Sequence, residues 1–158
     1  MADTAATAEP HAVLERYLAA PASARPRAFA ELRARVHELA AERSWERAAW
    51  LLRRAVLPGS DYTTLQSLHR DYVKLKPKLP AGPSVKLAVL GGFTTGPLSQ
   101  AIELALFSMG GSVELYEADY GVYRQEILDP ASALYAFEPE VVFLATSWRD
   151  LGRRPGVG

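Results

Sequence analysis

A proline-rich stretch, KPKLPAGP at positions 76–83, constrains the possible folds of this chain more than any other feature. Three prolines and a glycine within eight residues continue neither a helix nor the middle of a sheet, so the stretch is predicted to be a connector. The hydrophobic pattern changes across it. We therefore divide the chain into a helical segment over residues 1–75, a linker over 76–84 and an α/β domain over 85–158.

Apolar residues before the linker recur three and four positions apart, which places them on one face of a helix. A first helix around Val13–Leu18 is expected to stop at Pro21, and Ser44 and Asp61 are expected to cap two later helices. No fixed-period repeat is present, so a small bundle, or a helical cap on the following domain, is predicted. The stripes of the second, third and fourth helices are Phe29, Leu32, Val36 and Leu39; Trp45, Ala48, Ala49, Leu52 and Val56; and Leu65, Leu68, Tyr72 and Leu75.

After the linker the pattern alternates between strand and helix. Strands are predicted over 85–90, 113–116 and 141–145, and helices over 97–109 and 130–137, with a polar stretch after the second strand. This order predicts an α/β fold: a three-stranded parallel sheet with crossover helices, in the strand order 2-1-3.

The third predicted strand, VVFLA at 141–145, is apolar at every position, which is typical of a strand buried on both faces. Thirteen residues follow it, too few for another crossover helix and strand. The order 2-1-3 would leave this strand as an exposed, adhesive edge. We therefore expect a partial sheet, and a chain that either is part of a larger domain or forms a homodimer through this edge.

Composition excludes several classes of function. The chain has no cysteine, and His11, His37 and His69 lie far apart, so no metal site is expected. Residues 1–80 carry 13 Lys+Arg and 9 Asp+Glu, and residues 81–158 carry 5 and 9, an imbalance too small for a nucleic-acid-binding protein. An apolar run of about 18 residues and a signal peptide are both missing, so we expect no membrane contact and a cytoplasmic location.

The first candidate site is the glycine-rich turn after the first predicted strand. Its glycines match neither the dinucleotide fingerprint nor a phosphate-binding loop. One interpretation is structural, with the glycines allowing a tight turn and Thr94 or Thr95 capping the next helix. The other is ligand binding by Gly92, Thr94 and Thr95, because open α/β sheets bind ligands where their strands end.

The second candidate site follows the second predicted strand, where Tyr116, Asp119, Tyr123 and Arg124 could face the same crevice and bind a polar ligand. The structural alternative has Arg124 paired with a nearby carboxylate, and Asp129 capping the helix over 130–137. For catalysis, Thr94 is the candidate nucleophile. Since residues 85–158 contain no histidine, Thr94 would need His37 or His69 of the helical segment as its base.

Two stretches, VKLAVLGGFTTGPL (85–98) and VELYEADYGVYRQEILDPASALYAFEPEVVFLAT (113–146), resemble the N-terminal region of FkbH-like proteins of the haloacid dehalogenase superfamily, the HAD-IIIC group. In that family an α/β region similar to SGNH hydrolases precedes a dehalogenase-type domain. The resemblance implies polyketide or nonribosomal-peptide biosynthesis, in which a glyceryl unit from a phosphorylated glycolytic precursor is dephosphorylated and loaded onto an acyl carrier protein.

The motifs that carry the chemistry of these families are missing from this sequence. There is no Asp-x-Asp motif, so Mg²⁺ is expected only in a dehalogenase-type domain outside this chain, and no cofactor within it. Gly91-Gly92-Phe93 stands where SGNH hydrolases have Gly-Asp-Ser. We therefore predict a non-catalytic N-terminal module or truncated copy, serving as a scaffold or carrier-protein docking surface. The alternative is an SGNH-like esterase or acyltransferase that uses Thr94 and is completed by another chain.

Overall fold

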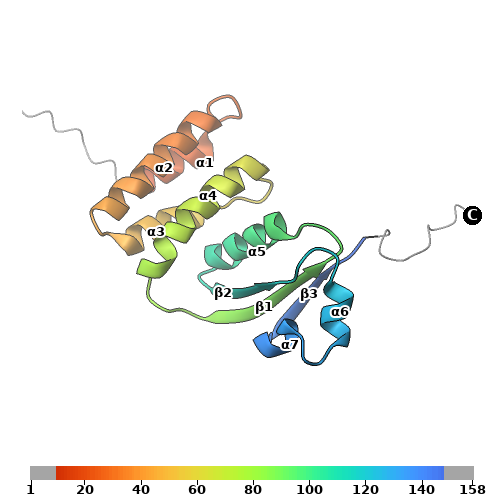
Figure 1. Ribbon diagram of the computed structural model, residues 1–158. Helices are drawn as coiled ribbons and strands as arrows, with labels where there is room; N and C mark the ends of the chain where they lie inside the picture. Colours follow the sequence, from red (N-terminus) through yellow and green to blue (C-terminus); the bar gives the residue numbers. More distant parts are fainter. Residues whose placement is uncertain (1–9, 148–158) are drawn as a thin grey trace, which may run out of the picture. The chain divides into compact units, whose positions relative to one another are not determined.

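The computed structural model describes residues 10–147. The chain separates into two compact units, one ending at Ala81 and the other beginning at Gly82. Figure 1 shows the first unit as helices coloured red to yellow-green, and the second as a green and blue sheet with its own helices. None of the helices in this part of the chain is long and apolar enough to cross a membrane.

The first unit is a bundle of helices, as the apolar stripes predict. Its described helices are α1 (Pro10–Ala19), α2 (Arg25–Ala41), α3 (Trp45–Ala55) and α4 (Tyr62–Leu75), followed by a 3-10 turn, η1 (Lys76–Lys78). α1 ends just before Pro21, as expected. Its core contains leucine side chains that are completely withdrawn from solvent: Leu32, Leu39, Leu51, Leu52 and Leu68.

One of the two predicted helix caps is confirmed. The side chain of Asp61 accepts a hydrogen bond of 2.8 Å from the backbone N–H of Thr64 and so caps α4. Ser44 precedes α3, but its side chain makes no capping hydrogen bond, so that prediction is wrong. The connection between α2 and α3 is short, and Arg43 adopts a left-handed backbone with φ 58°. The N–H of Ser44 therefore donates a hydrogen bond to the carbonyl of Leu39, so Ser44 takes part in the C-terminal cap of α2.

The second unit is built on a three-stranded parallel sheet. Its strands are β1 (Ser84–Gly91), β2 (Ser112–Glu117) and β3 (Val141–Ala145), and their order is β2-β1-β3, as predicted. α5 (Gly96–Ser108) connects β1 to β2, where a helix over 97–109 was predicted, and Leu98, Ile102 and Leu106 of this helix pack on the sheet. Its most buried side chains are Ser99, Glu103, Leu104 and Phe107.

The connection from β2 to β3 differs from the prediction. It contains two short helices, α6 (Tyr123–Leu128) and α7 (Ala133–Phe137), where one helix over 130–137 was expected. Asp129 does not cap the second of them; it ends α6, and its side chain accepts a hydrogen bond of 2.9 Å from the N–H of Ala131. Because of this turn, α7 begins at Ala133 and Ser132 is the residue before it.

Helices cover the two faces of the central strand. On one face Leu87 and Val89 of β1 pack with side chains of α5, among them Leu98 and Ile102. On the other face Ala88 and Leu90 pack with Tyr123 of α6 and Leu134 of α7. Figure 1 shows α6 and α7 together beside β3. β1 is therefore buried on both faces, as a central parallel strand should be.

β3 is an edge strand with four apolar side chains that remain about half exposed. Their exposed fractions are 49% for Val141, 48% for Val142, 44% for Phe143 and 47% for Leu144. The pairing of Val141 with Leu87 and of Val142 with Ala88 places successive β3 side chains on opposite faces of the sheet. Apolar surface is therefore left open on both faces of β3, and β1 is its only partner strand among the described residues.

Candidate functional site

The carboxyl ends of the three strands meet at one edge of the sheet. Val89 is in register with Glu117, and the N–H of Ala118 donates to the carbonyl of Val89 at 3.4 Å. The N–H of Gly92 donates to the carbonyl of Ala145 at the same distance. The turns after β1, β2 and β3 therefore lie at the same end of the sheet, where open α/β sheets bind ligands.

The turn after β1 is held by a close approach between its backbone and two neighbours. A Cβ added to Gly91 would stand 2.8 Å from the Cγ2 of Thr95 and 2.9 Å from the carbonyl oxygen of Ala145. Position 91 therefore requires glycine, because there is no room for a Cβ atom. Thr95 is 6% exposed, Gly92 is half-buried and Thr94 is exposed.

Neither reading of Thr94 or Thr95 as a side-chain cap is correct. Thr95 occupies the position before α5, but its side chain makes no capping hydrogen bond. Its backbone is already near-helical, at φ −90° and ψ −14°, and its methyl group faces Gly91. A cap needs extended backbone at this position, so Thr95 contributes packing and its carbonyl, which accepts from the N–H of Ser99 at 2.9 Å.

Tyr116, at the end of β2, is tied to the helices that follow. Its hydroxyl donates to Oε2 of Glu126 at 2.9 Å, and its ring stacks on Phe137 with centroids 5.6 Å apart. Glu126 Oε2 also accepts from the N–H of Leu134 at 3.0 Å. Burial raises the pKa of Tyr116 to about 12, and the negative charges of Glu126 and Asp119 add to the effect. Tyr116 is therefore a neutral anchor for α6 and α7.

The other predicted ligand-binding residues divide into buried and exposed groups. Tyr123 belongs to the core beneath α6, and its hydroxyl accepts a hydrogen bond of 3.2 Å from Nε of Arg124. The guanidinium of Arg124 also lies 5.7 Å from the centroid of the Tyr123 ring, within the range of a cation–π interaction. Asp119 and Arg124 themselves are exposed.

This edge of the sheet can supply a cation, a carboxylate and backbone amides to a ligand, from Arg124, Asp119 and the β1 turn. It does not supply a histidine base for Thr94, because His37 and His69 both belong to the helical unit. Among residues 10–147 no group of three or more metal-ligating side chains lies close enough together to hold a metal ion.

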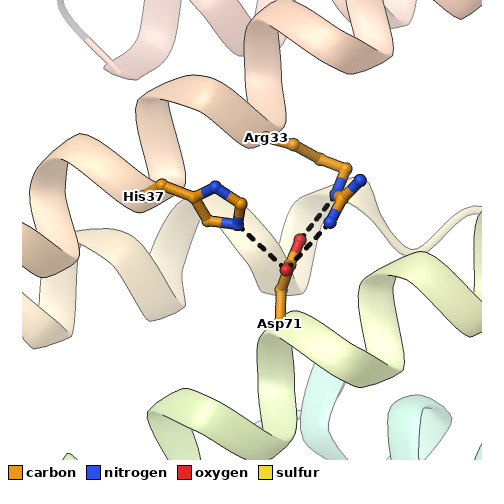
Figure 2. A network of polar contacts seen from close by, with 3 residues as sticks. All are labelled: Arg33, His37 and Asp71. Carbon is orange, nitrogen blue, oxygen red and sulfur yellow. Dashed lines mark hydrogen bonds and ion pairs between the residues drawn. The ribbon is translucent and has the colours of Figure 1, made fainter.

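A polar cluster in the helical unit was not anticipated from the sequence (Figure 2). Asp71 of α4 has a side chain only 1% exposed, and it accepts two hydrogen bonds from Arg33 of α2, at 2.6 and 3.0 Å. Nε2 of His37, one turn along α2, lies 2.9 Å from the same carboxylate. Burial alone would raise the pKa of Asp71, but hydrogen bonds from Arg33 and His37 outweigh it and hold the pKa below its usual 3.8.

A signal for this cluster does exist in the sequence. Asp71 lies three residues after Leu68 and four before Leu75, which places a carboxylate within the apolar stripe of α4. A charge at such a position is rarely buried without a partner. The pattern could have predicted an ion pair, although not the identity of the partner.

Comparison with known proteins gives one similar solved structure. No family model matches the chain, and no curated protein matches it significantly. The similar structure is the N-terminal part of the protein BF1531 from Bacteroides fragilis, which contains a phosphatase domain complexed with Mg. The two chains are 29% identical, and the match covers 58% of this chain and 23% of that one, with a TM-score of 0.48. This chain therefore spans less than a quarter of the length of the protein that it matches.

Proposed function

We propose that this chain is a non-catalytic scaffold module of the kind that precedes the dehalogenase-type domain in FkbH-like proteins, and that it docks its partner on β3. The observation that carries the proposal is the exposed apolar edge: four side chains of β3, each 44–49% exposed and open on both faces of the sheet. The sequence resemblance over residues 85–146 supplies the family, and the missing catalytic motifs favour a scaffold over an enzyme.

The energetic argument concerns what an uncovered β3 costs in water. Full burial of one such side chain contributes about 1.5–3 kcal/mol, so covering the exposed half of each contributes about 1 kcal/mol. The N–H of Glu140 already donates to Lys86 of β1, so strand geometry turns the N–H groups of Val141 and Phe143 away from the sheet. A partner strand would pair these groups and cover both apolar faces together.

In this proposal the reaction belongs to the partner domain. That domain would bind Mg²⁺, remove phosphate from a glyceryl donor and pass the acyl unit to an acyl carrier protein. The present chain would hold the domain and offer the carrier a docking surface, including Arg124 at the carboxyl edge of the sheet. Gly92, Thr94, Thr95, Tyr116, Asp119 and Tyr123 would shape that edge.

The docking role is tested by calorimetric titration with the dehalogenase-type domain of an FkbH-like protein from which its own N-terminal region has been removed. We expect saturable binding, which Val142→Lys and Leu144→Lys should weaken at least about tenfold, because each places a charge on the buried surface. Val73→Lys is the matched control, since Val73 is 50% exposed but lies on α4. Carrier-protein binding in the same assay should weaken with added salt. The proposal would be contradicted if no binding were detected at low salt, or if Val73→Lys weakened binding as much as Val142→Lys and Leu144→Lys do.

The rival catalytic role of Thr94 is tested by hydrolysis of a nitrophenyl ester. We expect wild-type protein and Thr94→Ala to show the same background rate, because the α/β unit supplies no histidine to activate the hydroxyl. A rate that falls on substitution would identify an enzyme and contradict the scaffold proposal. Circular dichroism of the variant shows whether its fold is retained.

A further inference from the structure

A cavity of about 520 Å³ opens on the helical unit, within the size range of small-molecule sites. It lies between the end of α1, the start of α2, and the segment from Leu57 into α4. Apolar groups form one part of its wall, among them Phe29 and the two prolines Pro26 and Pro58. Hydroxyl and charged side chains form the rest.

Tyr17 lines this cavity, and its hydroxyl has no described hydrogen-bond partner. The residue is 2% exposed, and it lines the cavity, so the little surface that it shows faces that space. Its ring packs on Phe29 with centroids 5.8 Å apart. The Tyr17 oxygen is not among the fully enclosed polar atoms that lack a partner, so water reaches it, and a ligand in the cavity would replace that water as its hydrogen-bond partner.

Two opposite charges line the same cavity without neutralising each other. Arg25 donates from Nη2 to the carbonyl of Ala20 at 3.1 Å, and Asp61 accepts from the N–H of Thr64 at 2.8 Å. No ion pair joins Arg25 to Asp61 in the described part of the chain. Both charges act on Tyr17: burial raises the pKa of its hydroxyl, Arg25 lowers it and Asp61 raises it. The hydroxyl therefore lies within the electrostatic reach of both.

We propose that this cavity binds a small zwitterion with an apolar body, such as an amino acid, whose carboxylate faces Arg25 and whose ammonium faces Asp61. The Tyr17 hydroxyl donates to the carboxylate, and Phe29 packs against the apolar body. Arg25 and Asp61 are both exposed, so water solvates the charge that a singly charged ligand leaves unpaired; a zwitterion gains a contact with each of them. The inference is independent of the docking proposal, because it concerns the helical unit alone.

The test is a titration of the full ¹⁵N-labelled chain with L-phenylalanine, followed by backbone amide shifts. For a ligand of this size we expect saturable shifts at Thr63, Thr64 and Ser67 with about millimolar affinity. Phenylpropionate, which lacks the ammonium, and phenethylamine, which lacks the carboxylate, should each bind about tenfold more weakly, because each loses one charge-assisted contact.

Three variants assign the contacts to residues. Asp61→Asn is the sharpest, because asparagine caps a helix as well as aspartate does and leaves α4 intact while removing the charge. Asp61→Asn should weaken the binding of L-phenylalanine about tenfold and leave the binding of phenylpropionate unchanged. Arg25→Gln should weaken the binding of L-phenylalanine about tenfold and leave the binding of phenethylamine unchanged. Tyr17→Phe should weaken the binding of L-phenylalanine and of phenylpropionate, which both carry a carboxylate. Shifts that do not saturate, equal binding of all three ligands, or L-phenylalanine binding unaffected by Asp61→Asn and Arg25→Gln would overturn the proposal.

Discussion

Replacing Arg33 with methionine should lower the free energy of unfolding of the helical unit by about 3 kcal/mol. Methionine keeps the apolar stem but removes both hydrogen bonds to Asp71, whose side chain is 1% exposed. A buried carboxylate without its cation is costly. We place the effect at the lower end of the range for broken buried pairs, because His37 remains 2.9 Å from the carboxylate. Urea unfolding followed by amide signals of α2 and α4 measures it.

The matched control is another arginine of the same helix. Arg27 pairs with Glu31 at 3.2 Å, but its side chain is 88% exposed, so water replaces the lost contact. Arg27→Met should change the unfolding free energy by less than about 0.5 kcal/mol. If the two substitutions cost the same, the Arg33–Asp71 pair does not stabilise the bundle in the way proposed here.

The same pair makes stability depend on pH in a defined direction. The pKa of Asp71 lies below its usual 3.8 in the folded protein, because hydrogen bonds from Arg33 and His37 outweigh the effect of burial. The stability that Asp71 contributes is therefore complete above the unfolded-state pKa of about 4 and is lost as the pH falls through the lower folded-state value. The wild-type protein should lose more unfolding free energy between about pH 5 and pH 3 than Asp71→Asn, which has no carboxyl to protonate.

The parts of the fold that the sequence predicted depend on short-range periodicity. α5 is visible because Leu98, Ile102 and Leu106 recur along one face, and these side chains do pack on the sheet. The order β2-β1-β3 follows from the crossover rule and from the uninterrupted apolar run of β3. Neither feature needs information from distant residues.

The parts that were missed depend on contacts between residues far apart in the sequence. The six residues of α6 are too few to show a helical period, and Tyr123, packed with Ala88 and Leu90, fixes them against the sheet. The Arg33–Asp71 pair joins residues 38 positions apart. At the candidate site, Thr94 and Thr95 fit a cap by residue type, but the space around Gly91 decides how that turn is built.

Gly91 therefore gives the second large expected effect. Gly91→Ala should destabilise the α/β unit by about 1–3 kcal/mol, the usual cost of inserting a methyl group where there is no room. The new Cβ would stand 2.8 Å from the Thr95 methyl and 2.9 Å from the Ala145 carbonyl, and the second of these is backbone, which cannot rotate away. Because Ala145 also accepts from Gly92, relief of the contact would disturb the edge at which the three strand ends meet.

A neighbouring glycine provides the control for Gly91→Ala. Apart from its chain neighbours and the backbone of α5 itself, nothing lies within 4 Å of a Cβ placed on Gly96, the first residue of α5, so Gly96→Ala should be neutral within about 0.5 kcal/mol. Adding Thr95→Ser to Gly91→Ala removes the threonine methyl and should recover part of the loss, while the contact with Ala145 remains. Urea unfolding followed by amide signals of β1 distinguishes these cases. Equal effects at Gly91 and Gly96 would mean that chain flexibility, and not the space beside β3, makes glycine necessary in this turn.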